Sequence, residues 1–411
     1  MKAGRTEVDV LVVGAGPGGA AAAYHLAKHG VNVLAVDKAR FPREKVCGDG
    51  LTPRGVRAMQ RMGVDPAEPG FIPVDGLRMH GAGVVLTLPW PDLSSFPRLG
   101  LVRTRHDFDH LLVQQAQKVG ALLWEEAEAT SPVLDDADWV TGATVKVDGE
   151  ERAVAARYVV AADGAASRFG ARAGVVRDDT RPLGVAARRY YRTEALQEPW
   201  LDAWLDLDER GVTLPGYGWI FPLGDGVLNV GAGLLNTFRD FKDISAKRVF
   251  DAFIAMLPAG WGVSEETAMA PVLSGPLPMG MNRRPLARRG LLLVGDAGGI
   301  VNPFNGEGIA YAMETGELAA DLIFESLARD RPAIAHLYPE VLRQRYGRYF
   351  AVGGLWAKAI GHPQLMRLAT RFGLPRKTLM RFAMRILAGL TDGLDGDAAD
   401  KVVYALTRLE R

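Results

Sequence analysis

The glycine-rich turn at residues 14–19 constrains the fold of this chain most strongly. A short apolar run rich in β-branched residues, VDVLVV at 8–13, leads into GAGPGG, and an alanine-rich stretch follows until Gly30. A second apolar run, VNVLAV, ends at Asp37. Alanine favours helix, and glycine commonly ends one. The pattern therefore predicts a strand, a glycine turn, a helix and a second strand that ends at an acidic residue.

Each part of this unit suits a dinucleotide. Gly14 permits the tight turn, Gly16 lets the backbone approach a pyrophosphate, and Gly19 allows close packing of helix on strand. The free N–H groups at the helix start favour a diphosphate, and Asp37 is placed to accept hydrogen bonds from a ribose. The alternative is an ordinary glycine-rich turn, but the flanking elements favour the dinucleotide. The residues expected to contact it here are Gly14, Gly16, Pro17, Gly18, Gly19, Asp37 and Lys38.

Length and residue types limit the other possibilities. The 411 residues suffice for two or three domains. No apolar stretch approaches the ~18 residues of a membrane-spanning helix, and Asp9 interrupts the N-terminal run, so we expect no signal peptide. The single cysteine, Cys47, cannot form an internal disulfide, and the scattered histidines lack metal-site motifs. We therefore expect a cytoplasmic protein without a metal.

The C-terminal part is unusually basic. Residues 341–391 contain ten Lys or Arg and no Asp or Glu, interleaved with aromatic and aliphatic residues. Basic amphipathic helices of this kind lie on anionic membrane surfaces, which favours a peripheral position on the inner face of the cell membrane. The alternative is a helical cap with its arginines in water. No recognised motif supports nucleic-acid binding.

The segment after Asp37 reads KARFPREKVCGDGLTPR, and its prolines and glycines predict a loop followed by a helix at 54–62. Because it starts beside the dinucleotide site, Cys47, Gly48 and Asp49 are candidates to contact the cofactor. A lone cysteine is usually an inert buried residue. Further along, Arg105 lies near the start of a helix, and Asp163-Gly164 closes a later strand.

Aromatic residues alternate in LPGYGWIFPLG, within a region of longer strands at 180–270. Successive side chains in a strand point to opposite faces, so Tyr217, Trp219 and Phe221 should share one face. They could pack in a core or line a substrate site.

A last motif begins with the apolar run LLLVGDAG, which places Asp296 at the carboxyl end of a strand. In NPFNGEG, Gly306 and Gly308 let the backbone approach a flat ring. The helix that follows offers N–H groups to a negative centre such as a reduced flavin.

These motifs, in this order, resemble the flavin oxidoreductases of the p-hydroxybenzoate-hydroxylase-like group. Within it the chain resembles the geranylgeranyl reductase family, which carries a proline–lysine–cysteine–glycine loop and a YxWxFP motif followed by GxG. These correspond here to Pro42, Lys45, Cys47 and Gly48, to Tyr217, Trp219 and Phe221-Pro222, and to Gly231 and Gly233. The sequence is most similar to bacterial members that saturate one isoprene unit of the menaquinone side chain.

The resemblance implies an α/β (α+β) fold with a discontinuous Rossmann-type FAD-binding domain, an interleaved antiparallel-sheet substrate domain and a C-terminal helical region. We place the first at 1–75, 101–178 and 271–330, the second at 76–100 and 179–270, and the third at 331–411. The implied cofactor is FAD, with Asp37 on the adenosine ribose, Arg105 and Asp296 on the ribityl–phosphate chain and Gly306–Gly308 beneath the isoalloxazine.

The same resemblance implies a polyprenyl substrate, menaquinone or a geranylgeranyl compound, and an external electron donor. Tyr217, Trp219 and Phe221 would contact the prenyl chain, and Cys47, Tyr217 and Trp219 would act in catalysis. Cys47 could deliver a proton, tune the flavin or be a small loop hydrophobe. Two other readings remain: a flavin monooxygenase or halogenase acting on a small aromatic, although the halogenase WxWxI motif is absent, and a non-enzymatic flavoprotein.

Overall fold

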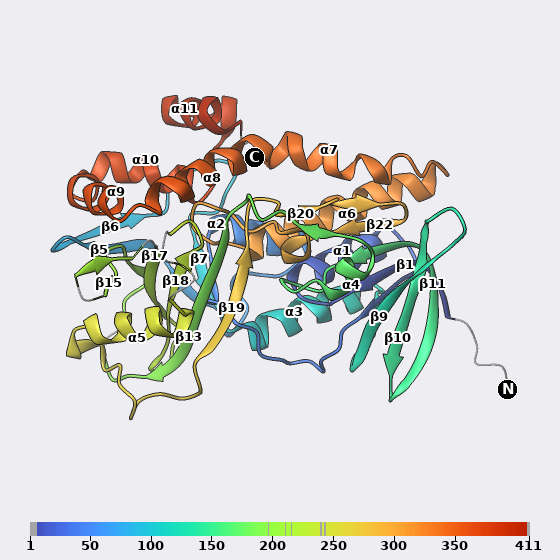
Figure 1. Ribbon diagram of the computed structural model, residues 1–411, viewed down its shortest axis with the longest axis horizontal. Coiled ribbons are helices and arrows are strands. Elements are labelled where there is room, and N and C mark those ends of the chain that lie inside the picture. The colour runs from blue at the N-terminus through green and yellow to red at the C-terminus, as the bar shows by residue number, and fades with distance from the viewer. Residues whose placement is uncertain are drawn as a thin grey trace.

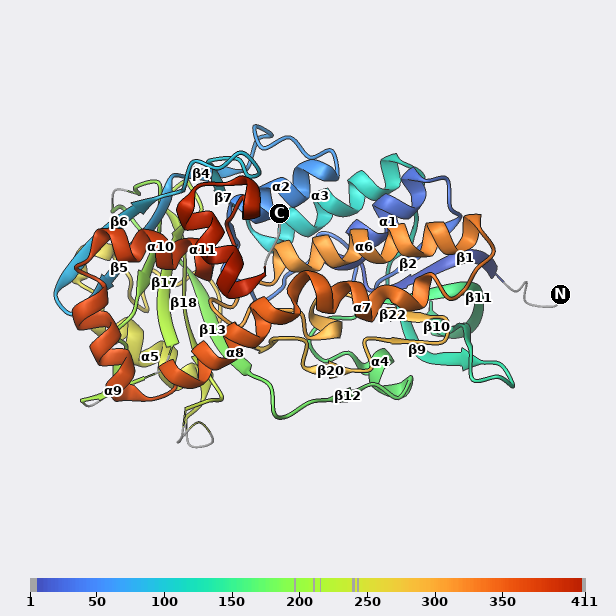
Figure 2. The same cartoon turned by 90° about the horizontal axis from the view of Figure 1, so that it is seen from above.

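Two large β-sheets lie side by side along the molecule, and the C-terminal helices run across both (Figures 1 and 2). The structure, a computed structural model, describes residues 6–195, 197–209, 211–214, 216–238, 241 and 244–408. It confirms the predicted α/β (α+β) class, with a Rossmann-type part, an antiparallel sheet and a helical C-terminal region.

The first sheet has eight strands and contains the N-terminal unit. Its core is parallel, with β1 between β11 and β2, and β9, β10 and β21 join it antiparallel. Its strands are β1 (Thr6–Val13), β2 (Val33–Val36), β8 (Leu122–Trp124), β9 (Ala127–Leu134), β10 (Val140–Val147), β11 (Glu150–Ala161), β21 (Ala287–Arg288) and β22 (Leu291–Leu293).

Helices cover this sheet and set the position of the glycine turn. The helices of this part are α1 (Pro17–Lys28), α2 (Pro53–Arg61), α3 (Arg105–Lys118), α4 (Arg168–Arg172) and α6 (Ile309–Ala328). A Cβ added at Gly316 of α6 would come within 2.3 Å of the Gly18 carbonyl oxygen of α1. The two helices therefore cross in backbone contact, which brings the late α6 segment to the first turn of the chain.

The second sheet has seven strands in the order β19-β13-β18-β17-β14-β5-β6 and is antiparallel except for the β14–β5 pair. Its strands are β5 (Gly76–Gly81), β6 (Val84–Pro89), β13 (Leu183–Arg192), β14 (Trp200–Trp204), β17 (Gly216–Pro222), β18 (Val227–Leu235) and β19 (Leu273–Pro278). Helix α5 (Ala246–Met256) buries Phe250 and Phe253 against it.

One predicted boundary differs from this topology. Residues from 271 onward were assigned to the FAD-binding part, but β19 pairs along its whole length with β13 of the seven-stranded sheet. The boundary therefore falls after Pro278. The sequence of β19, LSGPLP, carries two prolines and little alternation, so nothing local to it indicates a strand.

Short strands and single-turn helices lie outside the two large sheets. The small sheets pair β3 (Gly50–Leu51) and β4 (Ile72–Val74) with β7 (Gly100–Val102), β12 (Val176–Arg177) with β20 (Arg283–Arg284), and β15 (Asp208–Glu209) with β16 (Val212–Thr213). The single-turn helices are η2 (Ala259–Trp261), η3 (Gly295–Gly298), η4 (Ala335–Leu337) and η7 (Gly393–Asp395).

The C-terminal helices lie over both sheets, at the upper edge of Figure 1. They are α7 (Tyr338–Leu342), η5 (Arg343–Gly347), α8 (Arg348–Ile360), α9 (Pro363–Leu368), η6 (Ala369–Gly373), α10 (Lys377–Leu387) and α11 (Ala398–Thr407). A buried ion pair attaches them to the FAD-binding part: Arg54 of α2, fully buried, binds Glu314 of α6 at 2.8 Å, while Tyr346 donates to the same carboxylate at 2.7 Å.

Candidate active site

Three strands of the second sheet present one continuous face to the FAD-binding part. Directly opposite residues of antiparallel strands point to the same face. The three rows across β13, β18 and β17 are Ala186–Gly233–Tyr217, Arg188–Gly231–Trp219 and Tyr190–Asn229–Phe221. The Tyr217 and Trp219 rings lie 5.9 Å apart and the Trp219 and Phe221 rings 6.3 Å apart, which confirms that these aromatic side chains share a face.

The GxG pair makes room for the central aromatic ring. A Cβ at Gly231 would come within 2.1 Å of Cζ2 of Trp219, so the indole lies directly over this glycine. A Cβ at Gly233 would stand 3.6 Å from Ala186 Cβ and 3.9 Å from the indole, which is ordinary contact. The first glycine of the motif is therefore required by Trp219, and the second has space to spare.

The loop holding Cys47 packs against this aromatic face. Cβ atoms at Gly48 and Gly50 would each come within 3.1 Å of the Phe221 ring, so only glycines allow this approach without displacement. Asn229 joins the two: it accepts a hydrogen bond from Trp219 Nε1 at 3.0 Å and donates to the Cys47 carbonyl at 2.9 Å.

Asp49 fixes the loop in place. This buried residue has a φ of +67°. Its carboxylate accepts from Asn229 Nδ2 at 2.7 Å, from the Tyr190 hydroxyl at 2.7 Å and from the Arg105 backbone N–H at 3.2 Å. Burial raises the pKa of Asp49 to about 6, although the hydrogen bonds from Tyr190 and Asn229 lower this pKa. The carboxylate thus connects the loop to the aromatic sheet and to α3.

Cys47 is half-buried and lies beside the Arg105 side chain. Burial raises the pKa of its thiol, outweighing the Arg105 charge. Because the ordinary pKa of a cysteine is already above neutrality, Cys47 is a neutral thiol at pH 7.

The glycine turn has the conformation that the sequence predicts. Gly14 has a φ of +94°, and a Cβ there would meet the Ala162 carbonyl oxygen at 2.4 Å. A Cβ at Gly19 would come within 1.8 Å of the Gly14 oxygen. Helix α1 begins at Pro17 with no side chain capping its N–H groups. Asp37, next to Lys38 at the end of β2, accepts from the Ala15 N–H at 2.9 Å.

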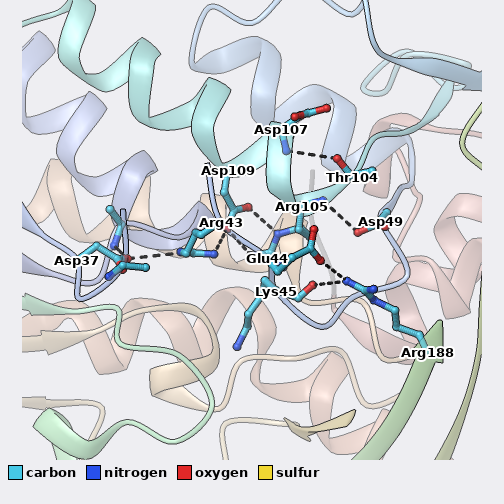
Figure 3. Close-up of polar contacts among 12 residues, drawn as sticks. Asp37, Arg43, Glu44, Lys45, Asp49, Thr104, Arg105, Asp107, Asp109 and Arg188 are labelled. Atoms are coloured by element: carbon cyan, nitrogen blue, oxygen red, sulfur yellow. Dashed lines mark hydrogen bonds and ion pairs between the residues drawn. The ribbon is translucent and has the colours of Figure 1, made fainter. Parts of the chain in front are cut away.

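Figure 3 shows two guanidinium groups close to Asp109: Arg43 lies between Asp37 and Asp109, and Arg105 lies on the other side of Asp109. Arg43 Nη1 binds Asp109 Oδ2 at 2.9 Å, and its Nη2 lies 3.7 Å from Asp37. Arg105 forms a bidentate pair with Asp109 at 2.6 and 2.8 Å. A Cβ at Gly16 would stand 3.5 Å from Arg43 Nη2, so this cation lies directly beside the turn.

The late motif completes the site from the other side. Burial raises the pKa of Asp296, and the charges of Lys45, Arg105 and Arg283 act against it, so four distant segments converge here. The loop 302–308 is closed by hydrogen bonds from Asn302 N–H to the Glu307 oxygen and from Gly306 N–H to the Asn302 oxygen, both 2.9 Å. The Tyr217 hydroxyl donates to the Asn305 carbonyl at 2.9 Å, which joins this loop to the aromatic strand.

These groups fit FAD. The uncapped start of α1, the tight turn in which Gly14 and Gly19 leave no space for a Cβ, and the neighbouring Arg43 guanidinium suit a pyrophosphate. Gly306, with a φ of +80°, keeps an open backbone surface beside the aromatic face. Among the residues that the structure describes, no three His, Cys, Asp or Glu side chains gather in a way that could hold a metal ion.

The comparisons with known proteins agree with this geometry. Residues 7–214 match the family model of the FAD binding domain. The chain is 38% identical over 395 residues to the menaquinone reductase of Mycobacterium tuberculosis, covering 96% of this chain and 94% of that protein. It is 31% identical over 350 residues to the digeranylgeranylglycerophospholipid reductase of Thermoplasma volcanium, covering 83% and 84%.

A solved structure agrees over the whole length. The crystal structure of a geranylgeranyl bacteriochlorophyll reductase-like protein from Thermoplasma acidophilum is 25% identical, covers 98% of this chain and 100% of its own, and superimposes with a TM-score of 0.79. The protein is thus an FAD-dependent oxidoreductase. More narrowly, it belongs to the geranylgeranyl reductase family, whose members act on prenyl chains.

The structure brings nearly all the predicted site residues into two adjoining groups: the turn with Asp37 and Arg105, and the aromatic face with the Cys47 loop and Gly306–Gly308. Several residues that hold these groups together are not among those that the sequence motifs predict. They are Arg43, Asp109, Arg188, Asn229 and Glu307. Asn229 lies two residues before the GxG motif, and Glu307 lies between two predicted glycines, so only their positions next to motifs could have drawn attention to them.

Proposed function

We propose that this protein reduces one isolated C=C bond of a polyprenyl chain, with the menaquinone side chain as its substrate. One observation carries the proposal: the hydrogen bond from Tyr217 to Asn305, which joins the aromatic face to the loop of Gly306 and Gly308. Known relatives named for menaquinone and for geranylgeranyl lipids support the substrate class. In this proposal the seven-stranded sheet carries the substrate.

We assign the FAD contacts as follows. The diphosphate lies on Gly14–Gly19 and Arg43, the adenosine ribose on Asp37, the ribityl–phosphate chain near Arg105 and Asp296, and the ring over Gly306–Gly308. Once reduced, the bound flavin supplies a hydride. In this proposal an external donor provides the electrons.

An isolated alkene is not electrophilic, so one of its carbons must gain a proton while the other receives the hydride. Positive charge develops at the more substituted carbon. Aromatic faces stabilise such charge by about 0.5–2 kcal/mol each, and Tyr217 and Trp219 present two adjacent rings. Burial raises the pKa of Tyr217 to about 12, so its ring stays neutral at pH 7. These rings also exclude water from the reacting carbons.

The direct test is to incubate reduced protein with menaquinone and measure the product mass. A gain of one H₂ that fragmentation places in the side chain and not in the quinone ring supports the proposal, and geranylgeranyl diphosphate serves as the competing substrate. Oxygen consumption with a small aromatic, without any prenyl reduction, would instead favour a monooxygenase or halogenase.

The C-terminal helices offer a surface for reaching a membrane-held substrate. Several large apolar side chains on α8–α10 are exposed, and basic residues surround them. The exposed apolar residues are Leu355, Trp356, Leu365, Leu368, Phe372 and Leu379, and the exposed cations are Lys358, Arg367, Arg371, Arg376, Lys377 and Arg381. None of the helices in the described ranges is long and apolar enough to span a bilayer. We propose that this surface, the apolar–basic patch, binds the inner face of the cell membrane peripherally.

Reversing three charges of the patch should weaken this binding. Each arginine near an anionic surface contributes about 1 kcal/mol, so the triple variant Arg371→Glu, Arg376→Glu, Arg381→Glu should lose most of its co-sedimentation with anionic vesicles. The control reverses Lys146, Arg152 and Arg157, exposed cations of β10 and β11 at the far end of the molecule (Figure 1). Equal co-sedimentation of the patch variant and the wild type would contradict the proposed membrane contact.

A further inference from the structure

Glu307 is a carboxyl group that the binding roles assigned above do not use. It lies in the loop between Gly306 and Gly308, and its backbone is held on both sides: its N–H donates to Asn305 Oδ1 at 2.9 Å and its carbonyl accepts from Asn302. Oε1 accepts a hydrogen bond from the Thr52 hydroxyl at 2.6 Å. Oε2 is buried and has no hydrogen-bond partner among the residues that the structure describes.

This carboxyl lies at the junction of the two groups of the active site. Thr52 directly follows the Cys47 loop, and Tyr217 contacts the Glu307 loop through Asn305. Burial is the main cause of the raised pKa of Tyr217, and negative charge on Cys47 or on Glu307 would raise this pKa further. A single ring of the aromatic face therefore lies within electrostatic reach of both groups.

The neighbouring acids are already committed to protein partners. Glu314 is paired with Arg54 and Arg57, and Arg54 holds its pKa near 2 against the effect of burial, so it is ionised. Asp49 accepts from three donors. Glu307 differs from both because its Oε2 is buried and accepts no hydrogen bond from the residues that the structure describes. A buried oxygen without a partner is costly unless it carries a proton or meets a ligand.

We propose that Glu307 is the acid that protonates the alkene. This inference rests on the proposed prenyl reduction. The π bond breaks, one carbon takes the hydride with both of its electrons, and the other takes the proton from Oε2. The O–H bond of Glu307 breaks and leaves a carboxylate, which regains a proton from water before the next turnover. The two hydrogens added to the chain thus have separate sources.

The surroundings of Glu307 suit this role. Burial, with a smaller contribution from the charge of Glu314, raises the pKa of Glu307 to about 7, although the Thr52 hydroxyl and Arg54 act in the opposite direction. The groups that face it are Thr52, Arg54, Glu314 and the buried phenols of Tyr217, Tyr311 and Tyr349. The carboxyl is therefore protonated below pH 7, and the rate of alkene reduction should fall as the pH rises through about 7.

The kinetic test uses protein with bound FAD, reduced with dithionite and mixed anaerobically with menaquinone. Glu307→Gln keeps the hydrogen bond from Thr52 but has no proton to give, so the rate at which the saturated side chain forms, followed by mass spectrometry, should fall by about 10²-fold. FAD content and reduction by dithionite should be unchanged. Glu325→Gln, at a partly exposed site on α6, is the matched control and should behave as the wild type.

A second variant separates the acid role from a structural one. Thr52→Val removes the hydrogen bond that lowers the pKa of Glu307, so the alkaline fall of the rate should move to higher pH. Infrared spectroscopy of the protein without FAD gives a readout independent of turnover. The C=O band of a protonated carboxyl should disappear as the pH rises through about 7, and Glu307→Gln should lack this band.

The outcomes are distinguishable. Wild-type turnover with an equally fast Glu307→Gln variant, or a pH profile that Thr52→Val leaves in place, overturns the acid role and leaves the proposed function standing. A wild-type protein that reduces no prenyl chain overturns both.

Discussion

Replacing Gly231 by alanine should reduce prenyl reduction by at least about 10²-fold while FAD remains bound. The added Cβ would lie 2.1 Å from the Trp219 indole, far inside contact distance, so the ring must leave its position over β18. Its hydrogen bond to Asn229 would break with it, and that residue also holds Cys47 and Asp49. A displacement of about 1 Å in an active site commonly costs 10²-fold in rate.

The matched control is Gly233→Ala, two residues along the same strand. Its Cβ would stand 3.6 Å from Ala186 and 3.9 Å from Trp219, so the ring can stay in place. Single-turnover rates and FAD absorbance of both variants are the measurement. Similar rates for the two variants would show that Trp219 is not needed where the structure places it.

Replacing Arg54 by methionine should lower the free energy of unfolding by about 3–5 kcal/mol. Arg54 is fully buried, pairs with Glu314 at 2.8 Å and donates to the Gly389 carbonyl at 2.9 Å. Removing one partner of a buried pair leaves the other charge poorly compensated, and methionine has the volume but not the charge. Chemical denaturation at pH 7 measures the loss. Arg61→Met is the control, because that arginine is half exposed and its pair with Glu317 should contribute under about 1 kcal/mol.

The pH dependence of this loss has a definite sign. Burial alone would raise the pKa of Glu314, but the charge of Arg54 outweighs burial and lowers this pKa to about 2. The folded-state pKa is therefore below the unfolded value of about 4.3. The stability from the ionised carboxylate is therefore present above pH 4.3 and is lost as the pH falls towards 2. The difference between the wild type and Arg54→Met should accordingly be largest near neutrality and shrink on acidification. A difference that grows in acid would contradict this account of the pair.

Local sequence predicted the parts of this protein that local physics determines. The positive φ of Gly14 and the close backbone approaches at Gly14 and Gly19 are possible only for glycine, so the sequence of this turn predicts its conformation. The alternation of Tyr217, Trp219 and Phe221 follows from the two-residue period of a strand. The basic composition of 341–391 similarly indicated the exposed helices of the apolar–basic patch.

What remained hidden depends on contacts between distant segments. Asn229 meets Cys47 and Asp49 across 182 and 180 positions of the chain, and Thr52 meets Glu307 across 255. No periodicity or spacing encodes such pairings, because they form only when the two sheets and α6 are assembled. The same reason explains β19, whose pairing with β13 and not its own proline-rich sequence makes it a strand.

The central claim is reduction of a prenyl chain by this aromatic site, and product mass tests it most directly. Purified protein with FAD, reduced and kept free of oxygen, is mixed with menaquinone, and the quinone is analysed by mass spectrometry with fragmentation. We expect the flavin to reoxidise and the product to gain one H₂ located in the side chain, with Gly231→Ala producing almost none. Reoxidation without a heavier side chain, or a quinone of unchanged mass, would contradict the account.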